Sequence, residues 1–183
     1  MKDNLKIISV LTIITVICGF ILAFVFTSAQ GKIQENQKQA IYRAITTIVP
    51  EAENIQEKTY GEDLVYELKD KNGEFLGYAY VTDGQGYQST ISILFAVDKD
   101  IRDILGIDII ESVETPGLGS RITEDAFKDQ FKNVPLAGIF EVVKELPQNP
   151  HQIQAITSAT VSSRAVVSIV NAGIEKLKAI LKK

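Results

Sequence analysis

The sequence predicts an α+β protein: a single amino-terminal transmembrane helix followed by an extracytoplasmic antiparallel sheet with covering helices. Three observations lead to this class. Residues 7–27 are uncharged and mostly apolar, four strand-like runs lie between residues 64 and 110, and an amphipathic helix pattern extends over residues 161–181. Apolar residues make up 45% of the chain and concentrate in the first segment, so the remainder has an ordinary globular composition.

The first element is a membrane anchor. A helix over residues 7–27 would be roughly 31 Å long, enough to cross the hydrocarbon core of a bilayer. A cleaved signal peptide is the alternative, because residues 27–29 fit a small-residue cleavage site. The apolar run is longer than the roughly 7–15 residues of a secretory signal, which favours an uncleaved anchor. The bulky Ile17 before Cys18 disfavours a lipid-modified cysteine.

Charges flanking the anchor predict its orientation. Lys2, Lys6 and the amino terminus precede it, whereas Lys32 and an acidic region follow it. The positive-inside bias therefore places the amino terminus in the cytoplasm and residues 30–183 outside. We expect a cytoplasmic end and anchor over residues 1–29, a helical stalk and linker over 30–60, and a folded domain over 61–183.

The stalk and the sheet come next. Apolar residues at 41, 44, 45 and 48 have helical spacing, and Pro50 ends that run. Residues 51–61 are polar and are expected to form a loop. Strands are expected at Leu64–Lys69, Glu74–Val81, Ser89–Val97 and Ile101–Ile110, with turn residues at 71–73, 84–86 and 98–100. Because no run of helical length separates them, we expect an antiparallel meander.

The last third of the chain is predicted to be mainly helical. Residues 123–132 favour a short helix with Thr123 as N-cap, and a short strand is possible at Phe140–Val143. The helix at 161–181 has one apolar stripe and lysines at its end. The stripe comprises Val166, Ile169, Val170, Ile174, Leu177, Ile180 and Leu181.

Composition excludes several classes of function. A net charge of −4 gives no electrostatic footprint for nucleic acid. The single cysteine and the single histidine, Cys18 and His151, argue against a disulfide and against cysteine- or histidine-based metal centres, so no metal site is expected. A Ser–His–Asp hydrolase would depend on His151, and no G-x-S-x-G pattern occurs.

Two segments are candidates for a binding site. Residues 155–163 contain several hydroxyl side chains, and they lie at the start of the last predicted helix. They fit ordinary helix capping by Thr160 or a neighbour, and they also fit an anion site made by helix N–H groups. Residues 114–119 (Glu-Thr-Pro-Gly-Leu-Gly) fit a surface loop, or a wall that lets backbone approach a flat ligand.

These two motifs, in this order behind one anchor, resemble the G subunit of Rnf-type electron-transport complexes. The C subunit of the sodium-translocating NADH:quinone reductase is a more distant match. The resemblance extends over nearly the whole chain, including residues 77–80, the turn at 84–87, the loop at 114–119 and the segment 157–164. It implies FMN joined covalently through its phosphate to a threonine, which maps to Thr160, by a dedicated flavin transferase.

Two glycines and a proline around Thr115 and Leu118, placed after a strand, predict that this loop lines the ring of such a cofactor. We expect the hydroxyl-rich segment and the loop to hold the cofactor, with Leu118 in apolar contact with the ring, Thr115 bonded to its polar edge and a charged Glu114 near it. The full predicted set is Thr160, Thr157, Ser158, Ala159, Ser163, Glu114, Thr115, Gly117 and Leu118. The sequence departs from the family pattern at Gln154, where an acidic residue is usual, and at Ser158, where glycine is usual.

The function implied by the resemblance is electron relay by covalent FMN, in a membrane complex that couples ferredoxin:NAD oxidoreduction to Na⁺ or H⁺ translocation. The partners would be the other membrane subunits and, during maturation, the transferase. No catalytic residue is expected in this chain. Two alternatives remain: a membrane-anchored binding or assembly module without cofactor, which Gln154 favours and Thr160 opposes, and a free-standing extracellular flavoprotein.

Overall fold

The computed structural model describes residues 2–182, and the chain divides after Gln39 into two compact units. Helix α1 (Lys2–Ile48) begins in the first unit and ends in the second. The predicted anchor and the predicted stalk are therefore parts of one continuous helix. The helix is long and apolar enough to cross a membrane, with a mean hydropathy of 2.8 over its most apolar window, and the side chains of that window are exposed.

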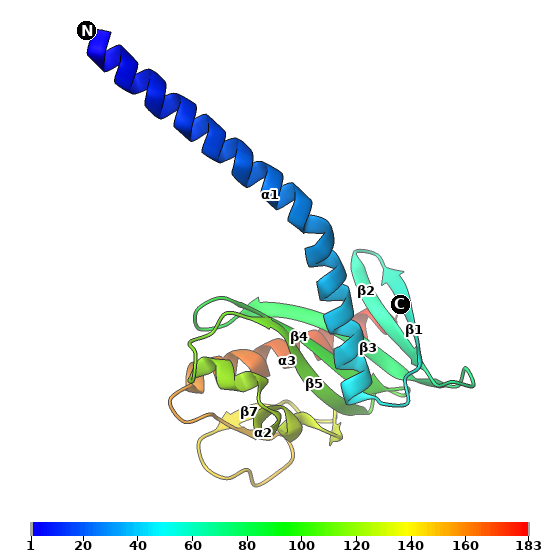
Figure 1. Cartoon of the computed structure of the whole chain (residues 1–183). Coiled ribbons are helices and arrows are strands. Elements are labelled where there is room, and N and C mark those ends of the chain that lie inside the picture. Colours follow the sequence, from blue (N-terminus) through cyan, green and yellow to red (C-terminus); the bar gives the residue numbers. More distant parts are fainter. Residues whose placement is uncertain (1, 183) are drawn as a thin grey trace. The chain divides into compact units, whose positions relative to one another are not determined.

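The second unit contains the predicted antiparallel meander, which is confirmed (Figure 1). Six strands follow one another in sheet order and pair antiparallel. They are β1 (Asn54–Tyr60), β2 (Asp63–Lys69), β3 (Phe75–Gln85), β4 (Thr90–Asp98), β5 (Asp103–Ser112) and β6 (Val134–Pro135). The α+β class predicted from the sequence is thus correct.

Both faces of this sheet are covered because its strands alternate between two apolar clusters. On β4, Phe95 faces a cluster that includes Val166 and Val170 of helix α3 (Thr160–Leu181), whereas Leu94 faces a cluster that includes Ile45 of α1. In Figure 1 the last turns of α1 lie on one side of the sheet and α3 on the other. Helix α3 is therefore held along one face of the sheet by apolar packing.

The prediction of a loop over the polar residues 51–61 was wrong for most of that segment. Residues 54–60 form β1, which pairs along its whole length with β2, and a tight turn at Gly61 (φ +66°) joins the two strands. Six of the seven residues of β1 are exposed. Backbone pairing alone defines this edge strand, so no alternation of apolar and polar residues marks it.

The predicted helix at residues 123–132 was also wrong in its bounds. Three short pieces occupy this region: η1 (Gly119–Thr123), α2 (Asp125–Lys128) and η2 (Asp129–Phe131). Thr123 ends η1, and its hydroxyl donates back to the Ser120 carbonyl at 2.9 Å. Glu124 is the residue before α2 and makes no capping bond through its side chain.

A small second sheet precedes α3. The strand considered at residues 140–143 is present as β7 (Glu141–Val143), and it pairs in parallel with β8 (Gln152–Gln154). Residue 155 continues this pairing, since its N–H donates to the Val143 carbonyl at 2.8 Å. The little sheet therefore fixes the chain just ahead of the hydroxyl-rich segment that opens α3.

Candidate functional site

The two segments singled out in the sequence meet in space. They enclose a hollow of about 550 Å³ between the start of α3 and the loop that leaves β5. Figure 1 shows the orange end of α3 beside that yellow-green loop. Its lining residues are Tyr87, Thr115, Leu118, Gly119, Ser158, Ala159, Thr160, Val161 and Ser162.

Local hydrogen bonds shape the start of α3. The N-cap is Ala159, not Thr160, and Thr160 is the first helical residue. Ser163 is fully buried, and its hydroxyl accepts the Ile156 N–H and donates to the Ala159 carbonyl, both at 3.0 Å. Ser158 makes the turn into the helix with φ +68°. This arrangement leaves Thr160 partly exposed at the wall of the hollow.

The first N–H groups of α3 border the same hollow. Such groups have no partner within their own helix. Across the described residues, no side chain caps this helix. Since the helix dipole adds partial positive charge at this end, the wall around Thr160 suits an anion.

The opposite wall is a compact turn. The N–H groups of Leu118 and Ser120 both donate to the Thr115 carbonyl at 3.1 Å, and the Gly117 N–H donates to the Ser120 hydroxyl at 3.0 Å. Gly117 has φ +73°, which glycine adopts without strain. The turn leaves Leu118 44% exposed, and Tyr87 and Val161 are also exposed large side chains, so the hollow has apolar surface for a flat ring.

The structure separates the predicted site residues into two groups. Thr115, Leu118, Ser158, Ala159 and Thr160 line the hollow. Four others support it from outside or lie beside it: Glu114, Gly117, Thr157 and Ser163.

Sequence reasoning missed four lining residues: Tyr87, Gly119, Val161 and Ser162. Gly119 and Ser162 belong to the motifs already singled out, and Val161 follows Thr160 directly. Tyr87 comes from the turn between β3 and β4, where the signals were an aromatic side chain after two glycines and the resemblance over residues 84–87.

A second hollow of about 230 Å³ lies around Gln154, one of the two positions where the resemblance leads us to expect another residue. Gln154 lines it together with Thr157, Arg121 and Glu124. The Gln154 backbone is held on both sides by Gln130, whose side chain accepts its N–H at 2.6 Å and donates to its carbonyl at 3.3 Å. Gln154 and Thr157 therefore border a separate, polar hollow next to the larger one.

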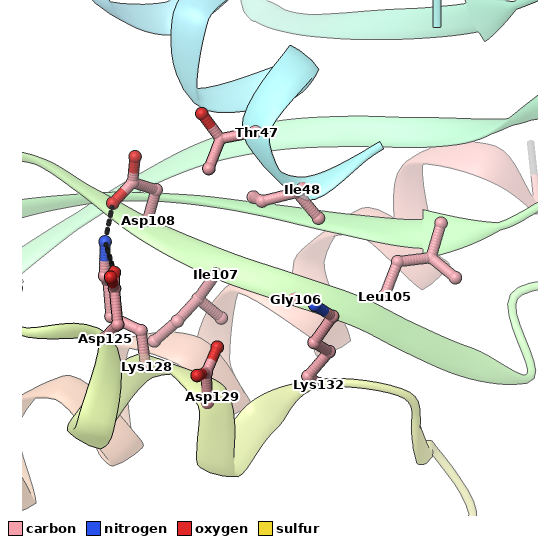
Figure 2. Close-up of a pocket in the computed structure, with 10 residues that line it drawn as sticks. All are labelled: Thr47, Ile48, Leu105, Gly106, Ile107, Asp108, Asp125, Lys128, Asp129 and Lys132. Atoms are coloured by element: carbon pink, nitrogen blue, oxygen red, sulfur yellow. Dashed lines mark hydrogen bonds and ion pairs between the residues drawn. The ribbon is translucent and has the colours of Figure 1, made fainter. Parts of the chain in front are cut away.

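A third hollow lies where the end of α1 meets β5 and α2 (Figure 2). Lys128 lines one side of it and forms ion pairs with Asp108 at 2.8 Å and with Asp125 at 3.2 Å. Its volume of about 60 Å³ has room for a few water molecules but not for a ring system. It is therefore a small packing gap with an ion pair in its lining.

Comparison with known proteins defines the class. A family model described as an FMN-binding domain matches residues 86–175, which include all the residues that line the large hollow. The chain thus contains a region that matches an FMN-binding domain, and this region follows the apolar helix α1.

The relatives define the family. The chain is 30% identical to the G subunit of the proton-translocating ferredoxin:NAD(+) oxidoreductase complex of Clostridium ljungdahlii, over 96% of this chain and 94% of that protein. It is 29% identical to the G subunit of the ion-translocating oxidoreductase complex of Methanosarcina acetivorans, over 97% and 96% of the two chains. The chain belongs to the family of G subunits of ion-translocating oxidoreductase complexes.

A solved structure supports the fold independently. The chain superposes on NqrC of Shewanella oneidensis with a TM-score of 0.54 at 21% identity, covering 72% of this chain and 73% of that one. At this identity the likeness concerns the fold. It agrees with the α+β arrangement described above.

Proposed function

We propose that this chain is the membrane-anchored electron-relay subunit that carries FMN in a complex coupling ferredoxin:NAD oxidoreduction to Na⁺ or H⁺ translocation. The observation that supports this most strongly is the large hollow. It is lined mainly by the two segments singled out in the sequence, it lies within the region matched by the FMN-binding domain, and its 550 Å³ is within the range of about 300–1,000 Å³ typical of cofactor pockets.

The proposal includes covalent attachment through Thr160. Thr160 lies at the wall of the hollow and is the first residue of α3. A phosphoester at this point would place the negative phosphate next to the N–H groups that begin the helix, an arrangement that favours the anion. Ser158 and Ala159 are small, so they leave room for the phosphate to approach the backbone.

The ring would lie toward the opposite wall. Leu118, Tyr87 and Val161 offer exposed apolar contact, and Thr115 offers a hydroxyl for the polar edge of the ring. FMN itself supplies the electron-transfer chemistry, so the residues of this chain bind the ring, orient it and limit the access of water to it. None of this requires a catalytic residue in the chain.

The anchor and the partners complete the proposal. The helix formed by residues 6–48 keeps the domain at the membrane, as suits a subunit of a membrane complex. We propose the amino terminus in the cytoplasm, an anchor ending near residue 29, a helical stalk, and a flavin domain on the outer side whose sheet also includes β1. A flavin transferase would join FMN to Thr160 during maturation, because a tethered cofactor cannot be lost to dilution outside the cell.

Intact mass of the full-length chain purified from membranes tests this function. The mass should exceed that of the sequence by one FMN less one water, and the denatured band should fluoresce in a gel. A chain without added mass, purified with its complex from cells that make the transferase, would instead favour the assembly module without cofactor.

A further inference from the structure

A buried carboxylate lies behind the wall of the large hollow. Glu114 is 5% exposed. Its Oε1 accepts the N–H groups of Tyr87 at 2.8 Å and Gln88 at 3.2 Å, and its Oε2 accepts the hydroxyl of Ser162 at 2.8 Å. A buried carboxylate is costly unless it is well bonded, and these three neutral donors provide that compensation.

Two glycines make room for this carboxylate. A Cβ on Gly86 would lie 2.3 Å from Oε1, and a Cβ on Gly119 would lie 2.7 Å from Oε2 and 2.7 Å from the Ser162 hydroxyl. Any larger residue at either position would push the carboxylate away from its donors. The backbone at Gly86 and at Gly119 therefore approaches the Glu114 carboxylate too closely for a larger residue at either position.

The carboxylate and its three donors belong to three segments that are distant in the sequence. Tyr87 and Gln88 lie in the turn between β3 and β4, Glu114 lies in the loop after β5, and Ser162 is in the first turn of α3. Each segment contributes lining residues to the hollow. A single side chain thus ties together the parts that surround the proposed flavin.

We propose that Glu114 is a positioning residue, a buried latch that fixes the walls of the flavin hollow without touching the ring. The inference rests on the proposed function, because it assigns Glu114 a role toward that cofactor. The sequence led us to expect a charged Glu114 side chain beside the ring. In this proposal the side chain instead acts on the ring indirectly, through Tyr87 and Ser162.

Substitution can separate geometry from charge. In Glu114→Gln the amide oxygen can keep both N–H donors, and the amide nitrogen can donate to the Ser162 hydroxyl, which also accepts. This variant removes the charge and keeps the bonds. Glu114→Ala removes both, and Ser162→Ala removes only the bond to α3.

The experiment uses the full-length chain with two measurements: visible circular dichroism of the attached flavin, which reports a fixed ring, and amide exchange. Glu114→Ala should retain the attached mass but lose most of the flavin dichroism, and the Tyr87 and Gln88 amides should exchange about tenfold faster. Glu114→Gln should keep both signals, and Ser162→Ala should lose part of the dichroism. Leu177→Ala, a fully buried change toward the other end of α3, should lower the unfolding temperature without altering the dichroism.

Three outcomes would overturn the latch. Unchanged dichroism and exchange in Glu114→Ala would show that the contacts do not fix the walls. Equal effects of Glu114→Gln and Glu114→Ala on the flavin dichroism would show that the charge of Glu114 acts directly. If the Glu114→Ala chain does not fold, the Ser162→Ala variant decides. The proposal is contradicted if the flavin dichroism of Ser162→Ala equals that of the wild type. A wild-type chain without flavin would instead refute the proposed function, while exchange at Tyr87 and Gln88 would still test the latch.

Discussion

Ser158 adopts a backbone conformation that most side chains avoid. Its φ of +68° lies in the left-handed region, which costs a non-glycine residue about 1–2 kcal/mol. This explains physically why the resemblance expects glycine there. Ser158→Gly should raise the free energy of unfolding by about 0.5–1 kcal/mol, because relief of strain exceeds the added freedom of the unfolded chain.

Thermal or denaturant unfolding of the full-length chain measures this effect. The matched control is Ser168→Gly, an exposed position in the middle of α3, which should lower stability by about 0.5 kcal/mol. A loss of stability in Ser158→Gly similar to that of the control would show that the turn into α3 is not strained.

Gln154 bears on the proposed attachment of the flavin. Its backbone bonds to Gln130 do not depend on its side chain, which borders the polar hollow beside Thr157. If an acidic residue here assists flavin transfer, Gln154→Asp should raise the flavinylated fraction measured by intact mass, or leave it unchanged where it is already complete. Gln154→Asn controls for the shorter side chain, and a clear drop specific to Asp would mean that Gln154 suits its own transferase.

At the residue scale, the sequence could predict what the motifs contain but not which way each side chain points. Thr160, Thr115 and Leu118 lie at the hollow because their segments do. Glu114 lies in the same motif, yet it is buried behind the wall. Its donors come from a turn 26 residues earlier and a helix 48 residues later, and the sequence gives no sign of such distant pairings.

Lys128, the last residue of α2, links this helix to β5 through its ion pair with Asp108. Burial alone would lower the pKa of Lys128, but the hydrogen bond and charge of Asp108, followed by those of Asp125, outweigh it and raise that pKa. Lys128→Met keeps the apolar stem and removes the charge. It should lower the free energy of unfolding by about 1 kcal/mol at neutral pH, because Asp108 then lacks its partner.

The sign of the pKa shift gives this effect a pH dependence. Because the folded-state pKa of Lys128 lies above its ordinary value of 10.5, the ion pair contributes fully below that pH and its contribution is lost as pH rises through the folded pKa. The stability difference between wild type and Lys128→Met should thus be constant from neutral pH to about 9 and shrink above 10.5. Asp125→Asn, at a largely exposed partner, should have little effect, and a difference that grows with pH would contradict the assignment.

At the element scale, the sequence predicted elements that bury apolar residues and missed those defined by backbone pairing. Strands β2 to β5 contain buried, mostly apolar residues, in continuous runs on β2 and β4, and helix α3 has its buried apolar residues at helical spacing. By contrast, β1 is almost wholly exposed and β6 has only two residues. The segment 119–131 alternates between short helical types, so its single predicted helix was too regular.

For the whole molecule, the proposed orientation can be tested by labelling single cysteines in intact cells. On a Cys18→Ala background, Lys71→Cys lies in the exposed turn between β2 and β3, and Asn4→Cys lies before the apolar segment. An impermeant maleimide should label Lys71→Cys in intact cells and Asn4→Cys only after lysis. The reverse pattern would place the flavin domain in the cytoplasm, and loss of the residue 4 label from the mature chain would indicate cleavage.

The site of attachment tests the central claim most directly. Trypsin should release residues 145–164 as one peptide, since Lys144 and Arg164 flank it, and fragmentation of that peptide locates the flavin. The account predicts FMN on Thr160, retained in Thr157→Ala and Ser163→Ala and absent from Thr160→Ala. The Thr160→Ala chain should still fold, because this side chain does not cap α3. Flavin mapped to Thr157 or Ser163, or a Thr160→Ala chain that still carries it, would contradict the account.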